Sequence, residues 1–349
     1  MPGSPFLTLS LDVGNDESMS ETSWRSALLR VLDAGGSTHE VVVSPDVDGL
    51  VSAALLARHK PVRIIGAYTT SHLLLGQGVD KERAADALWL DHDVSEPGIR
   101  CVGQHLVLRT AGDQLPRREK NSFNPNIWSP QPWDKSFAGV AGKKRDKYPY
   151  GTAHFLAVAL GASQEKLSTE QRALFAHADG TWRTVVDYRA NAVIWRDLMF
   201  PGDPLIDYLL DDYQSREEDL KAHAAIVTKL LATGVQAQQS RAPRAQLLPP
   251  HLKALTGNQS IAGRAGLQPD AYYARMGQVA RLIAEIFNTP VEVVEPYGSI
   301  ISGDYHSLYP NALPDNHDKF DDFMQSWEIF SHAFTDFRSL KVTKGIRLR

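Results

Sequence analysis

Short apolar runs and stretches with helical spacing alternate along the first third of the chain. Residues 40–43 form a β-branched run, residues 50–58 carry apolar side chains at helical spacing, and residues 62–68 form a second β-branched run. Residues 81–86 then end a helix, and residues 87–90 form a third apolar run. Strands that alternate with helices in this way predict an α/β fold, in which a mainly parallel sheet is flanked by helices on both faces.

The remainder of the chain continues this mixture of helices and strands. A long helix is expected from Asp203, an N-cap residue followed by a proline, to Gly234. His154 lies on the apolar face of another helix and is expected to be buried rather than to bind a metal. Further helices are expected at 24–32, 152–160, 169–178 and 268–288, and further strands at 99–108 and 291–294.

The length of the chain favours two domains. Its 349 residues correspond to two units of about 150 residues each. We expect a loose N-terminal arm at 1–22, an α/β domain at 23–200, a connecting helix at 201–235 and a smaller α/β domain at 236–349. The cleft between the two domains would hold the substrate.

Composition changes this picture only by exclusion. Hydrophobic residues make up 43% and charged residues 22% of the chain, which is ordinary globular usage and excludes a fibrous or wholly disordered protein. The formal net charge of −4 gives no global basic field that would indicate nucleic acid. The single cysteine, Cys101, and the lack of a signal peptide or membrane-spanning pattern lead us to expect a cytoplasmic protein without a membrane partner.

Acidic residues follow two of the expected strands. Asp46 and Asp48 lie in a turn after the first strand, and Asp91 and Asp93 flank His92 after the third. Because the ligand site of a parallel sheet lies beyond the carboxyl ends of its strands, the two turns are expected to converge. Carboxylates in such a place suit divalent cations with oxygen ligands. The alternative is an ordinary loop in which Asp46 or Asp48 caps the following helix.

Two further residues extend this set of candidates. His105 falls inside the strand expected at 99–108, where it is either a metal ligand or a histidine satisfied within the sheet. Asp179 lies at the end of the helix expected at 169–178. Carboxylates and imidazoles are the groups that bind metals or transfer protons.

In this order the motifs resemble the DHH phosphoesterase superfamily, and most closely its RecJ-like branch. The first motif of that family, Asp-x-Asp-Gly before a small-residue helix, is matched by residues 44–56, and the second, a strand that ends in aspartate, by Asp91. Gly-Gln-His at 103–105 stands where the family has Asp-His-His, and Asp179 matches its fourth aspartate. The Asn-Pro-Asn segment at 124–126 also follows in the family order, as does the Tyr-Pro segment that opens the helix near residue 152.

The resemblance spans about residues 40–190 and implies a metal-dependent phosphodiesterase or nuclease-like hydrolase. Such an enzyme holds one or two Mn²⁺ or Mg²⁺ ions, about 3.5–4 Å apart when two are bound, and Asp91 would bridge them. The implied metal ligands are Asp46, Asp48, Asp91, His105 and Asp179; the implied catalytic residues are Asp91, His92 and His105; and the implied substrate-binding residues are Ser44, Ser52, Asn124 and Asn126. The implied partner is single-stranded nucleic acid, or a short oligonucleotide or dinucleotide.

Departures from the family pattern leave other functions open. Ser44 replaces an acidic residue, Gly103 and Gln104 replace the first two residues of Asp-His-His, and a Gly-Gly-Gly-His signature is absent from the sequence. An inactive DHH-like binding or scaffold protein is therefore the alternative. A third hypothesis is a phosphatase similar to the haloacid dehalogenases with Asp46 as nucleophile, although Leu50 stands where that family has threonine.

Overall fold

The computed structural model describes residues 21–33, 36–105, 121–126, 147–232, 269–294, 299–308, 328–336 and 339–349. Most of the expected N-terminal arm and the expected domain boundary at 236 lie outside the described residues. None of the helices in these ranges is long and apolar enough to cross a membrane.

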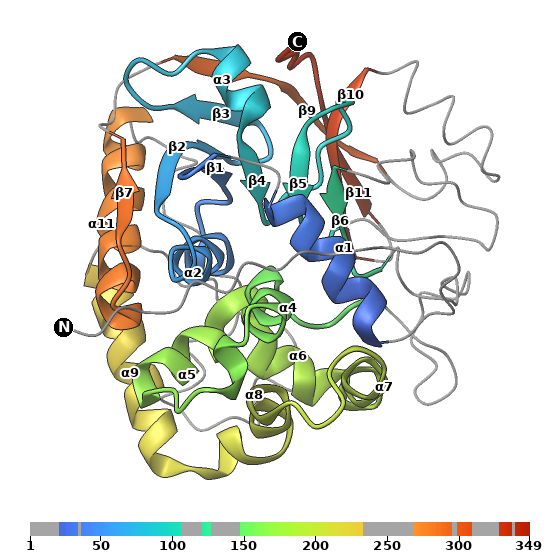
Figure 1. Cartoon of the computed structure of the whole chain (residues 1–349), viewed down its shortest axis with the longest axis vertical. Coiled ribbons are helices and arrows are strands. Elements are labelled where there is room, and N and C mark those ends of the chain that lie inside the picture. The colour runs from blue at the N-terminus through green and yellow to red at the C-terminus, as the bar shows by residue number, and fades with distance from the viewer. Residues whose placement is uncertain are drawn as a thin grey trace, which may run out of the picture.

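The described strands build a mixed, mostly parallel sheet (Figure 1). Its order is β6-β5-β4-β1-β2-β3-β8, and β7 also pairs with β2. The strands β6, β5, β4, β1, β2 and β7 are parallel to one another, whereas β3 runs antiparallel to both of its neighbours, β2 and β8. The bounds are β1 (His39–Val43), β2 (Val62–Tyr68), β3 (His72–Leu75), β4 (Leu88–Leu90), β5 (Arg100–Val102), β6 (Ser122–Phe123), β7 (Val291–Val293) and β8 (Ile300–Ser302).

The strand order reverses between β1 and β4. From β1 the chain first adds β2 on one side, and after β3 it crosses to add β4, β5 and β6 on the other. Loops that leave the carboxyl ends of two neighbouring strands in opposite directions open a crevice, and ligands of such sheets bind there. The expected strands at 40–43, 62–68 and 87–90 are thus confirmed, and the sheet places the acidic turns after β1 and β4 beside each other.

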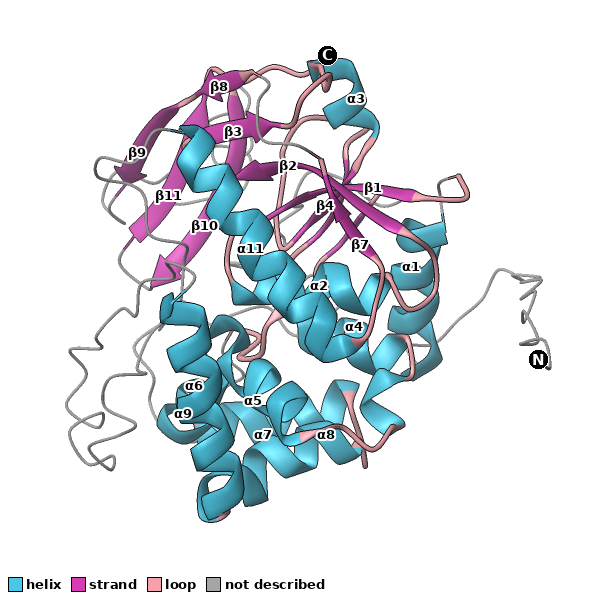
Figure 2. Cartoon of the chain, turned by 90° about the vertical axis from the view of Figure 1, so that its left-hand side faces the viewer, coloured by secondary structure: helices cyan, strands magenta, loops and turns pink. Residues whose placement is uncertain are grey.

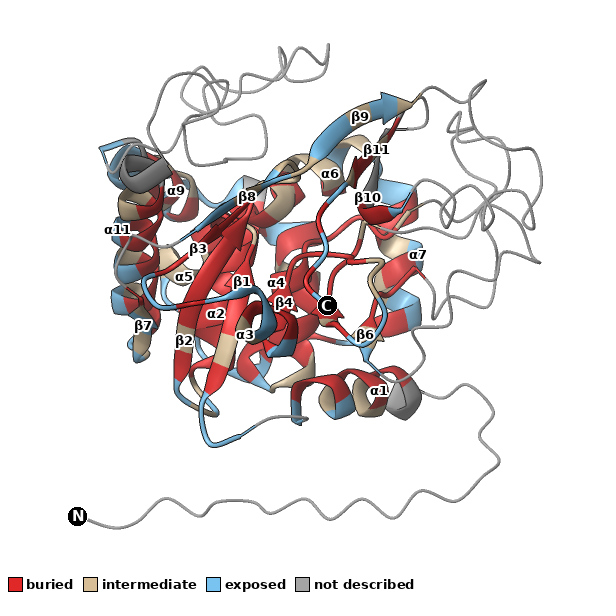
Figure 3. Ribbon diagram, turned by 90° about the horizontal axis from the view of Figure 1, so that it is seen from above, coloured by how far each residue is buried: buried red, intermediate tan, exposed pale blue. Residues whose placement is uncertain are grey.

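Helices cover one face of the sheet (Figure 2). Val41 and Val43 of β1 point into this helical layer, and Val42 points to the opposite face, as the two-residue period of a strand requires. Both faces of β1 are therefore buried (Figure 3). The helices in this layer are α1 (Glu21–Asp33), α2 (Val47–Leu56), α4 (Thr152–Ala159), α5 (Thr169–His177), α6 (Thr181–Asp187), α7 (Arg189–Met199) and α11 (Pro269–Phe287).

The opposite face packs against α3 (Lys81–Asp86) and a second sheet. This antiparallel sheet has the order β10-β11-β9, with β9 (Asp304–Leu308), β10 (Ile329–Asp336) and β11 (Ser339–Lys344). Phe330 packs edge-on against Trp89, and an isolated bridge joins Ser331 to Val94. The C-terminal strands therefore support the loop that follows β4.

The helix expected from Asp203 to Gly234 is broken, so the prediction of one continuous helix was wrong. Asp203 does cap its start, because its carboxylate accepts hydrogen bonds from two backbone amides. The broken stretch consists of α8 (Pro204–Asp207), the π-helical segment η3 (Tyr208–Asp212), the 3₁₀ turn η4 (Tyr213–Ser215) and, after an extended Arg216, α9 (Glu217–Ala232). The Tyr213 hydroxyl bonds the ring of His223 on α9, so tertiary contacts fold the chain back and α9 packs on α5.

The described residues beyond 268 extend the N-terminal sheet. The amphipathic helix expected at 268–288 is confirmed as α11, which packs on α2, and the strand expected at 291–294 is confirmed as β7, which pairs in parallel with β2. The strand β8 then pairs with β3. The pattern of a single strand does not indicate which distant strand it pairs with, so these pairings could not be predicted from the sequence.

Burial of a histidine in the helical layer predicts a dependence of stability on pH. His154 is fully buried as expected, and burial lowers its pKa from 6.5 to about 4. Between these values the unfolded chain binds a proton that the folded chain does not, so the free energy of unfolding falls as the pH falls. We expect His154→Gln to reduce this slope by up to about 1.4 kcal/mol per pH unit. Urea unfolding of both proteins from pH 7 to 4 measures how the free energy of unfolding depends on pH. The same dependence in the two proteins would contradict the prediction.

Candidate active site

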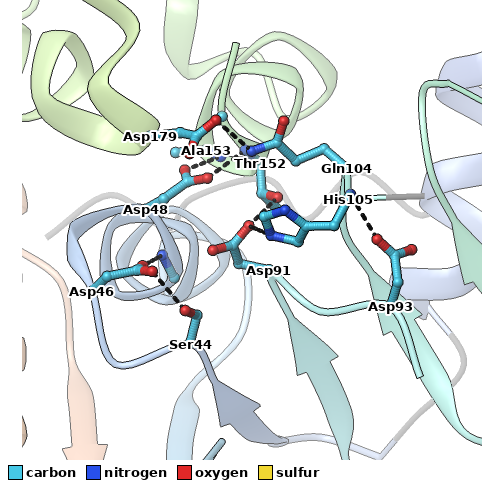
Figure 4. Close-up of polar contacts among 12 residues, drawn as sticks. Ser44, Asp46, Asp48, Asp91, Asp93, Gln104, His105, Thr152, Ala153 and Asp179 are labelled. Atoms are coloured by element: carbon cyan, nitrogen blue, oxygen red, sulfur yellow. Dashed lines mark hydrogen bonds and ion pairs between the residues drawn. The ribbon is translucent and has the colours of Figure 1, made fainter. Parts of the chain in front are cut away.

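Four aspartates and one histidine from separate elements meet at the carboxyl edge of the parallel sheet (Figure 4). Asp46 follows β1 and Asp48 lies in the first turn of α2. Asp91 follows β4, His105 follows β5, and Asp179 lies between α5 and α6. These are the five residues that the sequence predicted as metal ligands, and the fold brings them together.

Asp46 is the N-cap of α2. Its carboxylate accepts a hydrogen bond from the Gly49 amide at 3.0 Å and one from the Ser44 hydroxyl at 2.6 Å. A Cβ at position 49 would collide with the backbone oxygen of Ser44, which explains the glycine in this turn. The capping interpretation of Asp46 is therefore confirmed, and it is compatible with a place in the cluster.

Asp48 is bound by the amino end of α4. Its two oxygens accept hydrogen bonds from the backbone amides of Thr152 at 2.7 Å and Ala153 at 2.8 Å. These amides have no partner inside their own helix, and the positive end of the helix dipole favours a carboxylate there. A Cβ on Gly151 would approach both Asp48 oxygens to 2.6 Å, so only glycine leaves room for this contact.

Asp91 adopts a left-handed backbone conformation with φ of 60°. Its amide donates to the Val102 carbonyl of β5 at 2.7 Å, which fixes the turn after β4. The side chain accepts a hydrogen bond from the Thr152 hydroxyl at 2.8 Å, and the Nε2 atom of His105 lies 3.4 Å from Asp91 Oδ1. Asp48 and Asp91 are therefore both held by the first residues of α4.

His105 lies in a loop rather than inside a strand. We expected the strand to run from 99 to 108, but β5 ends at Val102 and residues 106–108 lie outside the described ranges. Gly103 bonds the carbonyl of Phe123, and the chain then turns towards the carboxylates. This placement puts the imidazole at the edge of the sheet, beside Asp91.

Asp179 is held by a residue for which the sequence suggested no role. The Gln104 side-chain amide donates to Asp179 Oδ2 at 2.8 Å, and Gln104 is fully buried. The backbone of Asp179 is left-handed, with φ of 50°, because it joins two helices across a kink. Gln104 therefore belongs to the site through its contact with Asp179.

Burial and mutual repulsion dominate the electrostatics of the cluster. Burial is the largest cause that raises the pKa of Asp46, of Asp48 and of Asp91. Neighbouring carboxylates raise them further: Asp179 acts on all three, and Asp46 acts on both Asp48 and Asp91. His105 acts in the opposite direction on Asp46. Such crowding of buried acids is a feature of functional sites.

The chemistry of this donor set fits a hard divalent cation. Carboxylate oxygens with one imidazole are the groups that Mn²⁺ and Mg²⁺ accept, and a cation would offset the repulsion between the acids. Within the described ranges, no three His, Cys, Asp or Glu side chains already surround one cation position. The hydrogen bonds of Asp46 and Asp48 account for this, since their oxygens point at backbone amides and a hydroxyl.

The remaining predicted site residues lie elsewhere. His92 packs edge-on against Tyr68 and Trp89 on the other side of the sheet, and burial lowers its pKa to about 3. Ser52 is fully buried in α2. Asn124 and Asn126, predicted to bind substrate, are also buried. The structure therefore does not bring these four residues to an accessible surface.

Comparison with known proteins adds no assignment. No protein-family model matches the chain, and no curated protein matches it either. The geometry of the site and the resemblance of its motifs are therefore the grounds for a function. Thr152 and Gly151, which support the carboxylates, could have been found only from the Tyr-Pro segment that the resemblance singles out before α4.

The contact between Asp48 and α4 gives a direct test of this geometry. We expect Gly151→Ala to destabilise the fold by about 1–3 kcal/mol, because the new Cβ would meet the Asp48 carboxylate at 2.6 Å. Gly36→Ala is the matched control, since a Cβ there meets nothing within 4 Å. Urea unfolding measures both, and equal effects of the two substitutions would argue against a tight contact at Gly151.

Proposed function

We propose that the chain is a divalent-cation-dependent phosphodiesterase that acts on nucleic acid ends or on short oligonucleotides. The observation that carries this proposal is the convergence of four carboxylates and one imidazole at the point where the strand order reverses. Acyl or hydride transfer has no need of so many crowded acids, whereas phosphoryl transfer with metal ions does. The resemblance to RecJ-like DHH proteins supports the same reaction.

The residues that would hold the cation are Asp46, Asp48, Asp91, His105 and Asp179. When bound, Mn²⁺ or Mg²⁺ supplies Lewis acidity towards a phosphoryl oxygen and lowers the pKa of water in the site. The hydrogen bonds from Thr152, Ala153 and Ser44 fix the carboxylates in place before any cation arrives. Preorganised groups of this kind need no rearrangement during the reaction.

His105 has the position of a proton-transfer group. Its side chain keeps 27% of its surface exposed, so a substrate can reach it, while Asp91 is buried beside its Nε2 atom. Asp91 orients the imidazole, and the Thr152 hydroxyl in turn orients Asp91. Where the carboxylates alone would hold the cation, a histidine in this position can instead give a proton to the leaving oxygen of a phosphodiester or take one from water.

A binding protein without catalysis is the second candidate. The observation that favours it is the contact between Gln104 and Asp179, because a neutral amide occupies one oxygen of a carboxylate that the cation would need. The substitution of Gly103 and Gln104 for two residues of the family motif points the same way. Such a protein would retain the crevice and bind a nucleic acid or nucleotide without cleaving it.

Cleavage assays distinguish the two candidates. We expect the protein with Mn²⁺ to hydrolyse labelled single-stranded DNA, RNA or dinucleotides, and Asp91→Asn and His105→Gln each to lower kcat/KM by about 100-fold or more, the loss typical of a removed proton-transfer or charge-stabilising group. Asp197→Asn is the control, because this aspartate is exposed on α7 and should leave the rate unchanged. Binding of substrate without cleavage would favour the second candidate. Cleavage that survives Asp91→Asn would exclude this cluster as the catalytic site.

Cation binding should also stabilise the fold. At a Mn²⁺ concentration about 100 times the Kd, the free energy of unfolding should rise by about 2.7 kcal/mol, since only the folded chain assembles the ligands. Without cations, Asp91→Asn should be at least as stable as the original protein, because it removes one of the mutually repelling acids. Thermal unfolding with and without Mn²⁺ measures both effects. Equal stabilisation of the two proteins by Mn²⁺ would show that the cation binds elsewhere.

A further inference from the structure

We propose that Asp93 and Asn124 are positioning residues for His105, which they hold so that its imidazole lies against Asp91. The importance of this positioning for the reaction rests on the proposed function, whereas the positioning of His105 by the two residues does not. Neither residue reaches the carboxylate cluster with its own side chain. They act instead through the backbone of the loop that carries His105.

A buried carboxylate links the two segments. Asp93, which is 3% exposed, accepts a hydrogen bond from the His105 backbone amide at 2.8 Å. The Asn124 side-chain amide lies 3.1 Å from each of the two Asp93 oxygens, and Asn124 is 1% exposed. The side-chain oxygen of Asn124 in turn accepts a hydrogen bond from the backbone amide of Asn126 at 2.9 Å. These contacts show that Asn124 is bound within the protein rather than available to a substrate.

This arrangement requires glycine at position 103. A Cβ at position 103 would lie 2.8 Å from Asp93 Oδ2 and 2.6 Å from the His92 carbonyl oxygen. The carboxylate of Asp93 therefore occupies the space that a side chain at 103 would need. The loss of an acidic residue at 103, relative to the family motif, is coupled in space to the presence of Asp93 after β4.

The described part of the loop after β5 is held mainly by contacts outside the sheet. The ladder between β5 and β6 comprises two residue pairs, Cys101 with Ser122 and Val102 with Phe123. Beyond it, the hydrogen bond that Asp93 accepts from the His105 backbone amide fixes the loop where a longer strand would otherwise do so. Asn126 supports Gln104, the residue before His105, in a similar way, because the side-chain amide of Asn126 donates to the Gln104 backbone carbonyl at 2.8 Å.

A double-mutant cycle tests this assignment. Asp93→Asn places an amide nitrogen in the Oδ1 position, against the donating nitrogen of Asn124, and Asn124→Asp places two carboxylates against each other, so each single substitution weakens the contact. The swap of both residues restores the contact with the two groups exchanged. The amide introduced at position 93 accepts from the His105 backbone through its oxygen and donates through its nitrogen to the carboxylate introduced at position 124, which still accepts from Asn126. Each variant keeps nearly the same side-chain shape.

The primary measurement is the long-range ¹H–¹⁵N spectrum of the histidine rings in the full chain without cation, with His105 assigned from its loss in His105→Gln. We expect each single variant to shift the His105 signals and the swap to return them. In the cleavage assay we expect each single variant to lower kcat by about 10- to 100-fold at little change in KM, and the swap to recover most of the rate.

The outcomes separate a positioning role from a structural one. Asn191→Leu is the control, since Asn191 is also a buried asparagine, and from α7 it bonds the backbone carbonyl of Lys147. This variant should lower stability and leave the His105 signals in place. Folded single variants with unshifted His105 signals would overturn the proposal, as would a folded swap variant with displaced signals. If the single variants do not fold, the swap variant decides alone. If the original protein shows no cleavage activity, the proposed function is refuted, and the spectral test of positioning still applies.

Discussion

The amino end of α4 holds the carboxylate of Asp48, and much of the described structure depends on this contact. It joins α4 to the first turn of α2, beside the place where the strand order reverses. The same turn of α4 supplies the Thr152 hydroxyl to Asp91, so one helix end supports two acids from two loops. An anion at a helix amino end satisfies amides that would otherwise be unpaired in a buried place.

The surroundings of the cluster carry costs that a fold selected for stability alone would avoid. Asp91 and Asp179 both have left-handed backbones, each of which costs about 1 kcal/mol or more for a residue other than glycine. Their carboxylates also repel one another in a buried setting. Strain and like charges gathered in one place are the mark of a site kept for what it binds, because packing alone gives no reason to retain them.

Residues 103 and 104, where the sequence departs from the DHH pattern that it resembles, have definite partners in the structure. The space beside Gly103 is filled by Asp93, and Gln104 bonds Asp179 instead of leaving a gap. His105 lies beside Asp91. The order of the motifs pointed to acids that lie together in the structure, and Gln104 is a neighbour of this set to which the motifs gave no role.

The alternation of β1, α2, β2 and β4 could be predicted from the amino-acid sequence, because the hydrophobic period of each segment is local. The meeting of the acids after β1 and β4 could be predicted too, because parallel strands end at the same edge of a sheet. Contacts between distant segments, in contrast, place His105 beyond the end of its strand, turn Asn124 inwards and break the helix after Asp203. Such contacts also join β7 and β8 to the first sheet. Each of these depends on partners distant along the chain, and a contact between distant residues imposes no period on the sequence around them.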